Sequence, residues 1–246
     1  MGVVHNAPRF TKNMITIIHT ANSETRYTTN ACIVSCGALT HYFRDNFAQL
    51  EMLVEKEKGI DAYDQMNEQA KTVPPGSDGL IVLPYFMGER TPVWDPYARG
   101  VLFGMSIAHT RGHMIRAFME GAAYALYQNF RYIRETGLKI KLPMSVGEGG
   151  AKSPLWRQII SDIFDIPVAF NADSKGAPVG NAINAGVGAG VFKDYSVAKE
   201  WMHFSDRHTP CEELHETYMK YFAIFERLYG KLADEFEALS HATGYR

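Results

Sequence analysis

The sequence has 246 residues, of which 46% are hydrophobic and 21% are charged, a balance typical of soluble globular proteins. Its net charge of −2 argues against a nucleic-acid-binding protein, which normally carries a basic stripe or patch. No apolar run is long enough to span a bilayer, and the start MGVVHNAPRF lacks the basic-then-apolar pattern of a secretory signal.

The N-terminal part of the chain predicts two strands and two helices. Segments 14–21 and 26–34 are rich in β-branched residues and are separated by the turn signal ANSET. After Gly37, apolar residues recur every three or four positions and predict a helix over about 38–58. A second helical pattern covers 60 to about 71, and TVPPGSDG after it is typical of a loop.

From residue 80 onward, strands alternate with helices. Thr110 is expected to cap a long helix that ends before Gly137, and Ser153 followed by Pro154 marks the start of the next helix. The expected elements are strand 80–86, helix 110–136, strand 139–146, helix 154–164, strand 167–172, helix 177–190 and helix 212–240. This order predicts an α/β fold, with a sheet covered by helices. Because no repeat or linker interrupts it, residues 1–246 are expected to form a single domain.

The cysteine and histidine residues show no convincing metal-binding pattern. Cys32, Cys36 and Cys211 are odd in number, which predicts reduced thiols in a cytoplasmic protein. His109 and His113 are four residues apart and could share a metal ion, but no third ligand is near them in sequence. We therefore expect these two histidines to be structural and predict no metal site.

The stretch VGEGGAKSPLWRQIISDIF, residues 146–164, joins a predicted strand to a predicted helix. Gly147, Gly149 and Gly150 permit positive φ angles and the close approach of a ligand. The free N–H groups at the start of the helix attract phosphates or polar ring edges. A tight turn that binds nothing fits the same residues equally well. A dinucleotide-dependent oxidoreductase fits poorly, because the third glycine of its fingerprint is missing.

Four blocks of sequence resemble the C-terminal half of the FGGY carbohydrate kinases, most closely the xylulokinase-like branch. In chain order they are GLIVLPYFMGERTPVWDPYARGVLFG, HTRGHMIRAFMEGAAYAL, VGEGGAKSPLWRQIISDI and GAPVGNAINAGVGAG. Their order and spacing are similar to the family's over nearly the whole chain. Phe118 departs from the pattern, because that position usually holds a smaller residue. Four blocks in register are far more specific than any one of them.

The resemblance implies an α/β domain of the ribonuclease-H-like, actin-like ATPase type, with a mixed sheet flanked by helices. It implies ATP and Mg²⁺ as cofactors and six nucleotide-binding positions: Gly37, His41, Gly149, Gly150, Ala151 and Ser153. The turn at 149–151 corresponds to the family's adenosine loop, and Ser153 to a polar residue near the adenine. Gly37 corresponds to a glycine that approaches the phosphates. His41 corresponds to a nucleotide contact, with an exposed helical residue of no such role as the alternative.

Phosphoryl transfer also needs a base that takes the proton of the sugar hydroxyl. The resemblance implies that this base and most of the sugar site belong to an N-terminal half, so we expect no catalytic residue in this chain. Gly2, Val3 and Val4 match the tail of the family's phosphate loop. The chain alone is expected to be inactive, to meet its pentulose-like sugar only with the N-terminal half, and to lack the first strands of its sheet. Homodimerisation is expected to cover the exposed edges.

A different class of function remains compatible with these residues. The chain could be a non-catalytic nucleotide-binding or interaction module that acts with a separate partner. In the loop GERTP, Glu89 and Arg90 are expected to form an ion pair or a backbone clamp and not a catalytic pair. The apolar stripe of helix 212–240, which ends at Leu239, is expected to be core. The sequence does not specify the sugar, because sugar-contacting residues are expected in the N-terminal half.

Overall fold

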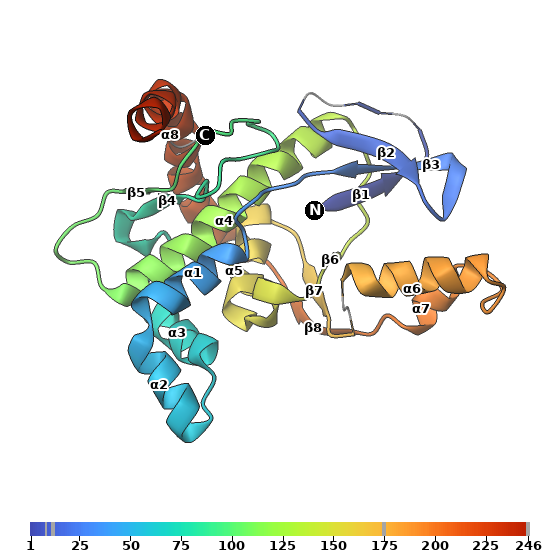
Figure 1. The fold of residues 1–246 in the computed structure, drawn as a ribbon, viewed down its shortest axis with the longest axis horizontal. Helices are drawn as coiled ribbons and strands as arrows, with labels where there is room; N and C mark the ends of the chain where they lie inside the picture. Colours follow the sequence, from blue (N-terminus) through green and yellow to red (C-terminus); the bar gives the residue numbers. More distant parts are fainter. Residues whose placement is uncertain (8, 11–12, 174–175, 245–246) are drawn as a thin grey trace.

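The computed structural model describes residues 1–7, 9–10, 13–173 and 176–244. These residues form three short sheets and a set of surrounding helices (Figure 1). The fold is therefore mixed α/β, as the alternation of sequence patterns predicts. None of the helices in these ranges is both long and apolar enough to cross a membrane.

The first sheet is antiparallel and lies on the right of Figure 1. It consists of β1 (Gly2–His5), β2 (Ile15–His19) and β3 (Asn22–Asn30), in the order β1-β3-β2. The hairpin turn is shorter than the predicted ANSET turn, because His19 already pairs with Asn22. The strand expected over 26–34 ends at Asn30, since the backbone N–H and C=O of Cys32 bond to Thr91 and not to a neighbouring strand.

The single helix predicted over 38–58 is two helices. α1 (Ala38–Phe47) and α2 (Gln49–Lys58) are separated at Ala48, whose φ of −119° and ψ of 40° are not helical. The Ala48 side chain is fully buried at this bend, and α2 packs against α3 (Ala62–Lys71). The prediction was wrong because the apolar spacing of three to four residues continues through a break of one residue.

The middle of the chain forms a two-stranded sheet and a long central helix. β4 (Ile81–Leu83) pairs antiparallel with β5 (Val101–Phe103), after the short 3₁₀ helix η1 (Ser77–Gly79). α4 (Arg111–Glu135) packs against β4, α3 and α5 and is buried along most of its length. Thr110 caps α4 as predicted, in a capping box with His113. The strand expected over 80–86 is confined to β4.

The third sheet contains β6 (Met144–Val146), β7 (Val168–Asn171) and β8 (Phe204–His208), in the order β6-β7-β8. β6, α5 (Pro154–Phe164) and β7 form a parallel strand–helix–strand unit, whereas β8 is antiparallel to β7. The strand expected over 139–146 is reduced to its last three residues, and Pro143 just before them has no N–H to give to a ladder. α6 (Ala177–Gly188) and the short α7 (Val197–Glu200) lie beside this sheet (Figure 1).

The hydrophobic core lies where α4 and α5 meet the C-terminal helix α8 (Glu212–Thr243). The ring of Tyr124 on α4 lies 5.9 Å from that of Phe222 and 5.6 Å from that of Phe225, both on α8. Phe236 is also buried, but Leu239 is 51% exposed. The prediction that the whole stripe of α8 is core is therefore wrong at its last residue, where the face of the helix turns to solvent.

Each of the three described sheets ends in edge strands, and β1 and β6 are two of them. β1 pairs with β3 alone, and β6 pairs with β7 alone. Both of these edge strands line the same cavity. The fold therefore places a hollow between its first and third sheets.

Candidate functional site

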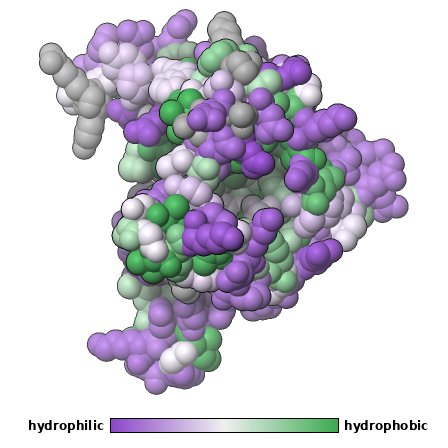
Figure 2. All heavy atoms as spheres, turned by 90° about the vertical axis from the view of Figure 1, so that its right-hand side faces the viewer, coloured by the Kyte–Doolittle hydropathy of each residue, from purple (hydrophilic) through white to green (hydrophobic). Residues whose placement is uncertain are grey.

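The cavity between the first and third sheets has a volume of about 1230 Å³. Leu126 and Phe130 on α4 and Ile160 and Phe164 on α5 give it an apolar wall. Figure 2 looks onto this end of the molecule and shows the surface hollowed, with mainly hydrophilic side chains around the opening. A concave site with an apolar wall and a polar rim is typical of small-molecule binding.

Charged side chains around the cavity are mostly positive. Among the described lining residues, the arginine and lysine residues are Arg9, Arg26, Lys139 and Lys141, and the acidic residue is Glu148. Arg9 also donates to the backbone oxygen of Thr136 at the end of α4, which holds its guanidinium near the rim. An excess of positive charge in a cleft attracts polyanions such as a triphosphate.

The glycine turn forms one side of this cavity. β6 ends at Val146, the 3₁₀ helix η2 (Gly149–Lys152) follows, and α5 begins at Pro154. Gly149 has a φ of +49°, and a side chain added there would meet no atom within 4 Å. The backbone at Gly149 therefore borders open space, as a surface that receives a ligand requires.

Gly150 and Ser153 pack against the interior of the protein and so determine the shape of the turn. A β-carbon added at Gly150 would overlap the ring of Trp156, which is itself buried and donates from Nε1 to the oxygen of Met119. The Ser153 hydroxyl accepts from the Trp156 N–H at 3.2 Å and donates to Asn67 Oδ1 at 3.0 Å. Ser153 is thus the N-cap of α5, as predicted, and its hydroxyl is engaged inside the protein.

Gly37 also lines the cavity. It directly precedes α1, and no side chain caps that helix. The positive end of a helix of ten residues therefore lies beside the cavity. Gly37 reaches this place because the segment before it leaves the first sheet and is held by the loop that contains Glu89 and Thr91.

His41 lies outside the cavity wall. It is exposed on α1, and its Nδ1 lies 2.5 Å from the hydroxyl oxygen of Tyr63 on α3. The structure therefore brings four of the six predicted positions to the cavity and leaves two, His41 and Ser153, away from its wall. The four are Gly37, Gly149, Gly150 and Ala151.

Arg157 supports the turn and was not singled out from the sequence. It lies on α5 with only 2% of its surface exposed, and its Nη1 donates to the oxygens of Ala151 at 2.7 Å and Lys152 at 3.0 Å. Its position four residues after the N-cap, between the apolar residues Trp156 and Ile160 of α5, is the sequence signal that could have found it. A buried arginine needs partners for all its N–H groups, so such a position predicts a clamp.

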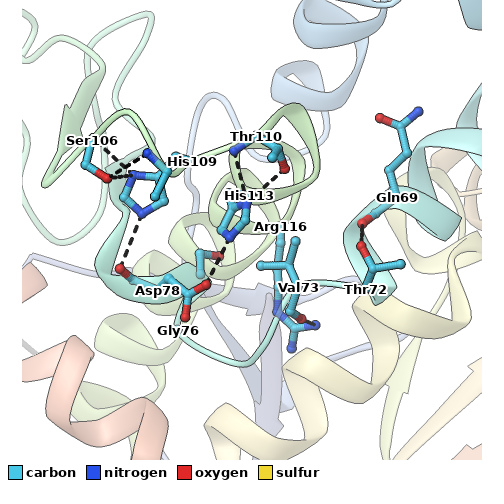
Figure 3. Close-up of polar contacts among 12 residues, drawn as sticks. Gln69, Thr72, Val73, Gly76, Asp78, Ser106, His109, Thr110, His113 and Arg116 are labelled. Atoms are coloured by element: carbon cyan, nitrogen blue, oxygen red, sulfur yellow. Dashed lines mark hydrogen bonds and ion pairs between the residues drawn. The ribbon is translucent and has the colours of Figure 1, made fainter.

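His109 and His113 take part in local structure (Figure 3). His113 Nδ1 accepts from the Thr110 N–H, and its Nε2 lies 3.0 Å from Asp78 Oδ2. His109 Nδ1 accepts from the Ser106 N–H, and its Nε2 lies 3.3 Å from the backbone oxygen of Asp78. Across the described ranges, no group of three or more histidine, cysteine or acidic side chains could hold a metal ion.

Glu89 is a backbone clamp, one of the two roles expected for it. Its Oε1 accepts from the N–H groups of Val34 at 3.0 Å and Arg90 at 2.7 Å. Burial raises the pKa of this carboxyl to about 7. The clamp fixes the segment that leads to Gly37, so it supports the cavity without lining it.

The sequence of the chain is similar to those of sugar kinases. Residues 1–189 match the C-terminal domain of the FGGY family of carbohydrate kinases. A gluconokinase of Bacillus licheniformis is 33% identical over 205 residues, which are 83% of this chain and 40% of that protein. A xylulose kinase of Bacillus subtilis is 32% identical over 175 residues, which are 71% of this chain and 35% of that protein. The chain thus spans less than half the length of these relatives.

The fold is similar as well. The crystal structure of xylulose kinase from Rhodospirillum rubrum matches with a TM-score of 0.77 and 28% identity, covering 96% of this chain and 46% of that one. This likeness confirms the expected fold class, an α/β domain of the actin-like ATPase type. The glycine turn and the residues that line the cavity lie within residues 1–189, the range that matches the family.

Proposed function

Because the chain belongs to the FGGY family of carbohydrate kinases, we propose that it is the ATP-binding domain of a sugar kinase. In this proposal residues 1–246 form one C-terminal domain. The complete enzyme transfers the γ-phosphate of ATP to a hydroxyl group of a sugar, and a pentulose-like sugar is the proposed class. An acyclic sugar acid is the competing class, since relatives are named both gluconokinase and xylulose kinase.

One observation carries the proposal for the nucleotide. The bare backbone of the glycine turn, the start of α1 at Gly37 and four cationic side chains all border a single cavity. The uncharged backbone at Gly149, Gly150 and Ala151 suits the adenosine end of ATP. The cations suit its phosphates, whose charge they offset.

Glu148 supports this orientation of the ligand. It is the carboxylate next to the glycine turn, and it would repel a phosphate placed there. The phosphates are therefore proposed to lie away from Glu148, toward Gly37 and the start of α1, where the helix dipole favours negative charge.

Mg²⁺ is proposed to enter with the nucleotide. Mg²⁺ in such sites is held largely by phosphate oxygens and water, with one or two carboxylates. The described residues contain no cluster of side chains that would bind it by themselves. When bound, the ion would offset the charge of the phosphates during transfer.

The chain alone is proposed to bind nucleotide without catalysing transfer. A base must lie within hydrogen-bond reach of the sugar hydroxyl. Glu148, the carboxylate that lines the described cavity, stands at the adenosine end in this proposal. The base and the sugar site are therefore proposed to come from the N-terminal half.

Calorimetry with Mg-ATP tests this function. Gly149→Asn places a side chain in the open space of the cavity, and asparagine tolerates a positive φ. We expect it to weaken Mg-ATP binding at least about tenfold, because the side chain fills the site proposed for adenosine. Gly59→Asn is the matched control, since Gly59 also has a positive φ and open space but does not line the cavity.

Equal binding by the parent and Gly149→Asn would contradict the proposed adenosine site. Clear phosphorylation of a pentulose by the purified chain would contradict the proposed division of the enzyme into two halves. Binding of NAD in preference to Mg-ATP would contradict the nucleotide assignment itself.

A further inference from the structure

Arg157 is a buried charge held between the glycine turn and the third sheet. The carbon at the centre of its guanidinium lies 4.5 Å from the ring centroid of Phe170 on β7. With 2% of its surface exposed, it needs an acceptor for each of its N–H groups, because an unpaired buried charge is strongly unfavourable. These acceptors lie on two different segments of the chain, which Arg157 therefore links.

On one side Arg157 fixes the backbone of the turn. Its Nη1 group donates to the oxygens of Ala151 and Lys152, at 2.7 and 3.0 Å. Because each peptide unit is planar, fixing these two carbonyl groups also fixes the N–H groups of Lys152 and Ser153. The Arg157 side chain thus fixes the orientation of the turn from the side that faces away from the cavity.

On the other side Arg157 bonds to β8. Its Nε donates to His208 Nε2 at 3.0 Å, and its Nη2 donates to Asp206 Oδ2 at 2.9 Å. Asp206 is the extra residue where the register of β8 shifts between Ser205 and Arg207, and its carboxylate and the His208 ring both reach the guanidinium. The same guanidinium therefore links β8 to the turn 149–152.

The bond to His208 requires a neutral ring. Arginine can only donate, so His208 Nε2 must carry no proton, and His208 Nδ1 donates to Gln158 Oε1 at 3.1 Å. Burial and the charge of Arg157 lower the pKa of His208. The charged groups that face this ring are Arg157 and Asp162 on α5 and Asp206 on β8, while Val168, opposite it on β7, is uncharged. Protonation would turn the acceptor into a second cation beside Arg157.

We propose that Arg157 is a positioning residue for nucleotide binding, which holds the turn 149–152 in its receptive conformation only while His208 is neutral. This inference rests on the proposed function, in which the turn receives adenosine. Arg157 itself does not line the cavity, so it acts through the backbone that it holds.

The substitution Arg157→Lys tests the clamp. Lysine keeps the charge but has no planar fork to reach two carbonyls, an imidazole and a carboxylate at once. We expect Mg-ATP binding by calorimetry to weaken on the order of tenfold. We also expect faster hydrogen exchange of the amides at 149–153, with exchange in α8 unchanged. Arg131→Lys is the control, since Arg131 pairs with Glu226 on α4 and α8, away from the cavity.

A pH series separates positioning from a general structural role. The affinity of the parent for Mg-ATP should fall as His208 becomes protonated on acidification. His208→Gln offers an acceptor that does not titrate, so its affinity should fall less over the same range. Comparison of the two proteins at each pH cancels the titration of ATP itself. Asp206→Asn removes only the charge of the exposed partner, so it should weaken binding less than Arg157→Lys does. It is the variant to measure if Arg157→Lys does not fold.

Different outcomes distinguish the two proposals. If the parent binds Mg-ATP and Arg157→Lys binds it equally, or if His208→Gln has the same pH profile as the parent, the positioning role is overturned. If the parent binds no nucleotide, the proposed function fails and the nucleotide role of Arg157 fails with it. The hydrogen-exchange measurement then still shows whether Arg157 holds the turn.

Discussion

At the scale of single residues, Glu148 has the most unusual backbone of the site. Its φ of 55° and ψ of 174° lie in a region that is open essentially to glycine alone. The residue nevertheless carries a side chain, whose carboxylate lies beside Gly176 at the start of α6. Strain of this kind is stored where the surrounding structure holds the chain firmly, often at ligand sites.

Glu148→Gly is expected to stabilise the fold. Removing the strain should gain about 1–3 kcal/mol, and the greater freedom of glycine in the unfolded chain should offset about 0.5–1 kcal/mol of that. The free energy of unfolding, measured with urea, should therefore rise by about 1 kcal/mol. Removing a carboxylate from a mainly cationic rim should also tighten Mg-ATP binding.

Glu148→Gln is the matched variant for this prediction. It removes the charge but keeps a side chain in the strained conformation. Only the glycine variant should gain stability, whereas both should bind Mg-ATP more tightly. A glycine variant less stable than the glutamine variant would show that the backbone of Glu148 is not strained in solution.

At the scale of elements, the loop around Glu89 holds the irregular segment between β3 and α1 in place and contacts the central helix α4. Glu89 Oε1 accepts from Val34, and Thr91 bonds to the backbone of Cys32, so the chain between β3 and α1 is fixed without being a strand. Asn129 on α4 donates to the oxygen of Thr91, which anchors the loop to the central helix. The position of Gly37 at the cavity depends on this set of contacts.

The Glu89 clamp should make stability depend on pH. Burial raises the pKa of its carboxyl from 4.5 to about 7, so between these values the folded protein binds a proton that the unfolded chain has lost. The stabilising contribution is thus complete below about pH 4.5 and is lost as the pH rises through about 7. Relative to Glu89→Gln, the parent should lose about 2 kcal/mol of unfolding free energy between about pH 5 and about pH 8.

Urea unfolding of both proteins at the two pH values measures this difference. Glutamine keeps the size of the side chain and an oxygen that accepts from Val34 and Arg90, so the clamp itself survives. Other groups that titrate in this range are common to both proteins and cancel. Parallel pH profiles for the parent and the variant would mean that Glu89 is ionised throughout and that its second oxygen is solvated.

At the scale of the whole molecule, the strands form separate short sheets with open edges. β1 and β6 both border the cavity, each with a strand on one side only in the described chain. At the outer edge of the first sheet, Ile17 and Ile18 on β2 are 53% and 60% exposed. Unpaired edges with apolar side chains favour pairing with another chain.

The purified chain is therefore predicted to form a homodimer. Sedimentation velocity should show a species of twice the mass that grows with protein concentration. Ile17→Lys should shift the population toward monomer, because a charged side chain on an edge strand opposes pairing. Lys231→Arg on α8, which keeps the charge at an exposed position away from this sheet, should leave the population unchanged. A strictly monomeric parent at high concentration would contradict the prediction.

Local patterns in the sequence were sufficient for the parts of the fold that depend on neighbouring residues. The caps at Thr110 and Ser153, the glycine turn and the α/β alternation could all be predicted, because a cap or turn is decided within three or four residues. The similarity of four blocks then indicated the family. Of the six nucleotide-binding positions that the resemblance implies, Gly37 and the turn at 149–151 line the cavity, whereas His41 and Ser153 do not.

Only the tertiary structure decided what depends on residues far apart in the chain. The break at Ala48 follows from packing against another helix, and the partner of His41 lies on that helix, so neither is encoded in local periodicity. Arg157 meets β8 about fifty residues later, at His208, and Arg9 reaches the cavity rim near the end of α4. The sequence by itself determined most of the longer helices and strands and the family to which they belong. The long-range packing decided which side chains surround the cavity, because burial and pairing join groups that no local pattern connects.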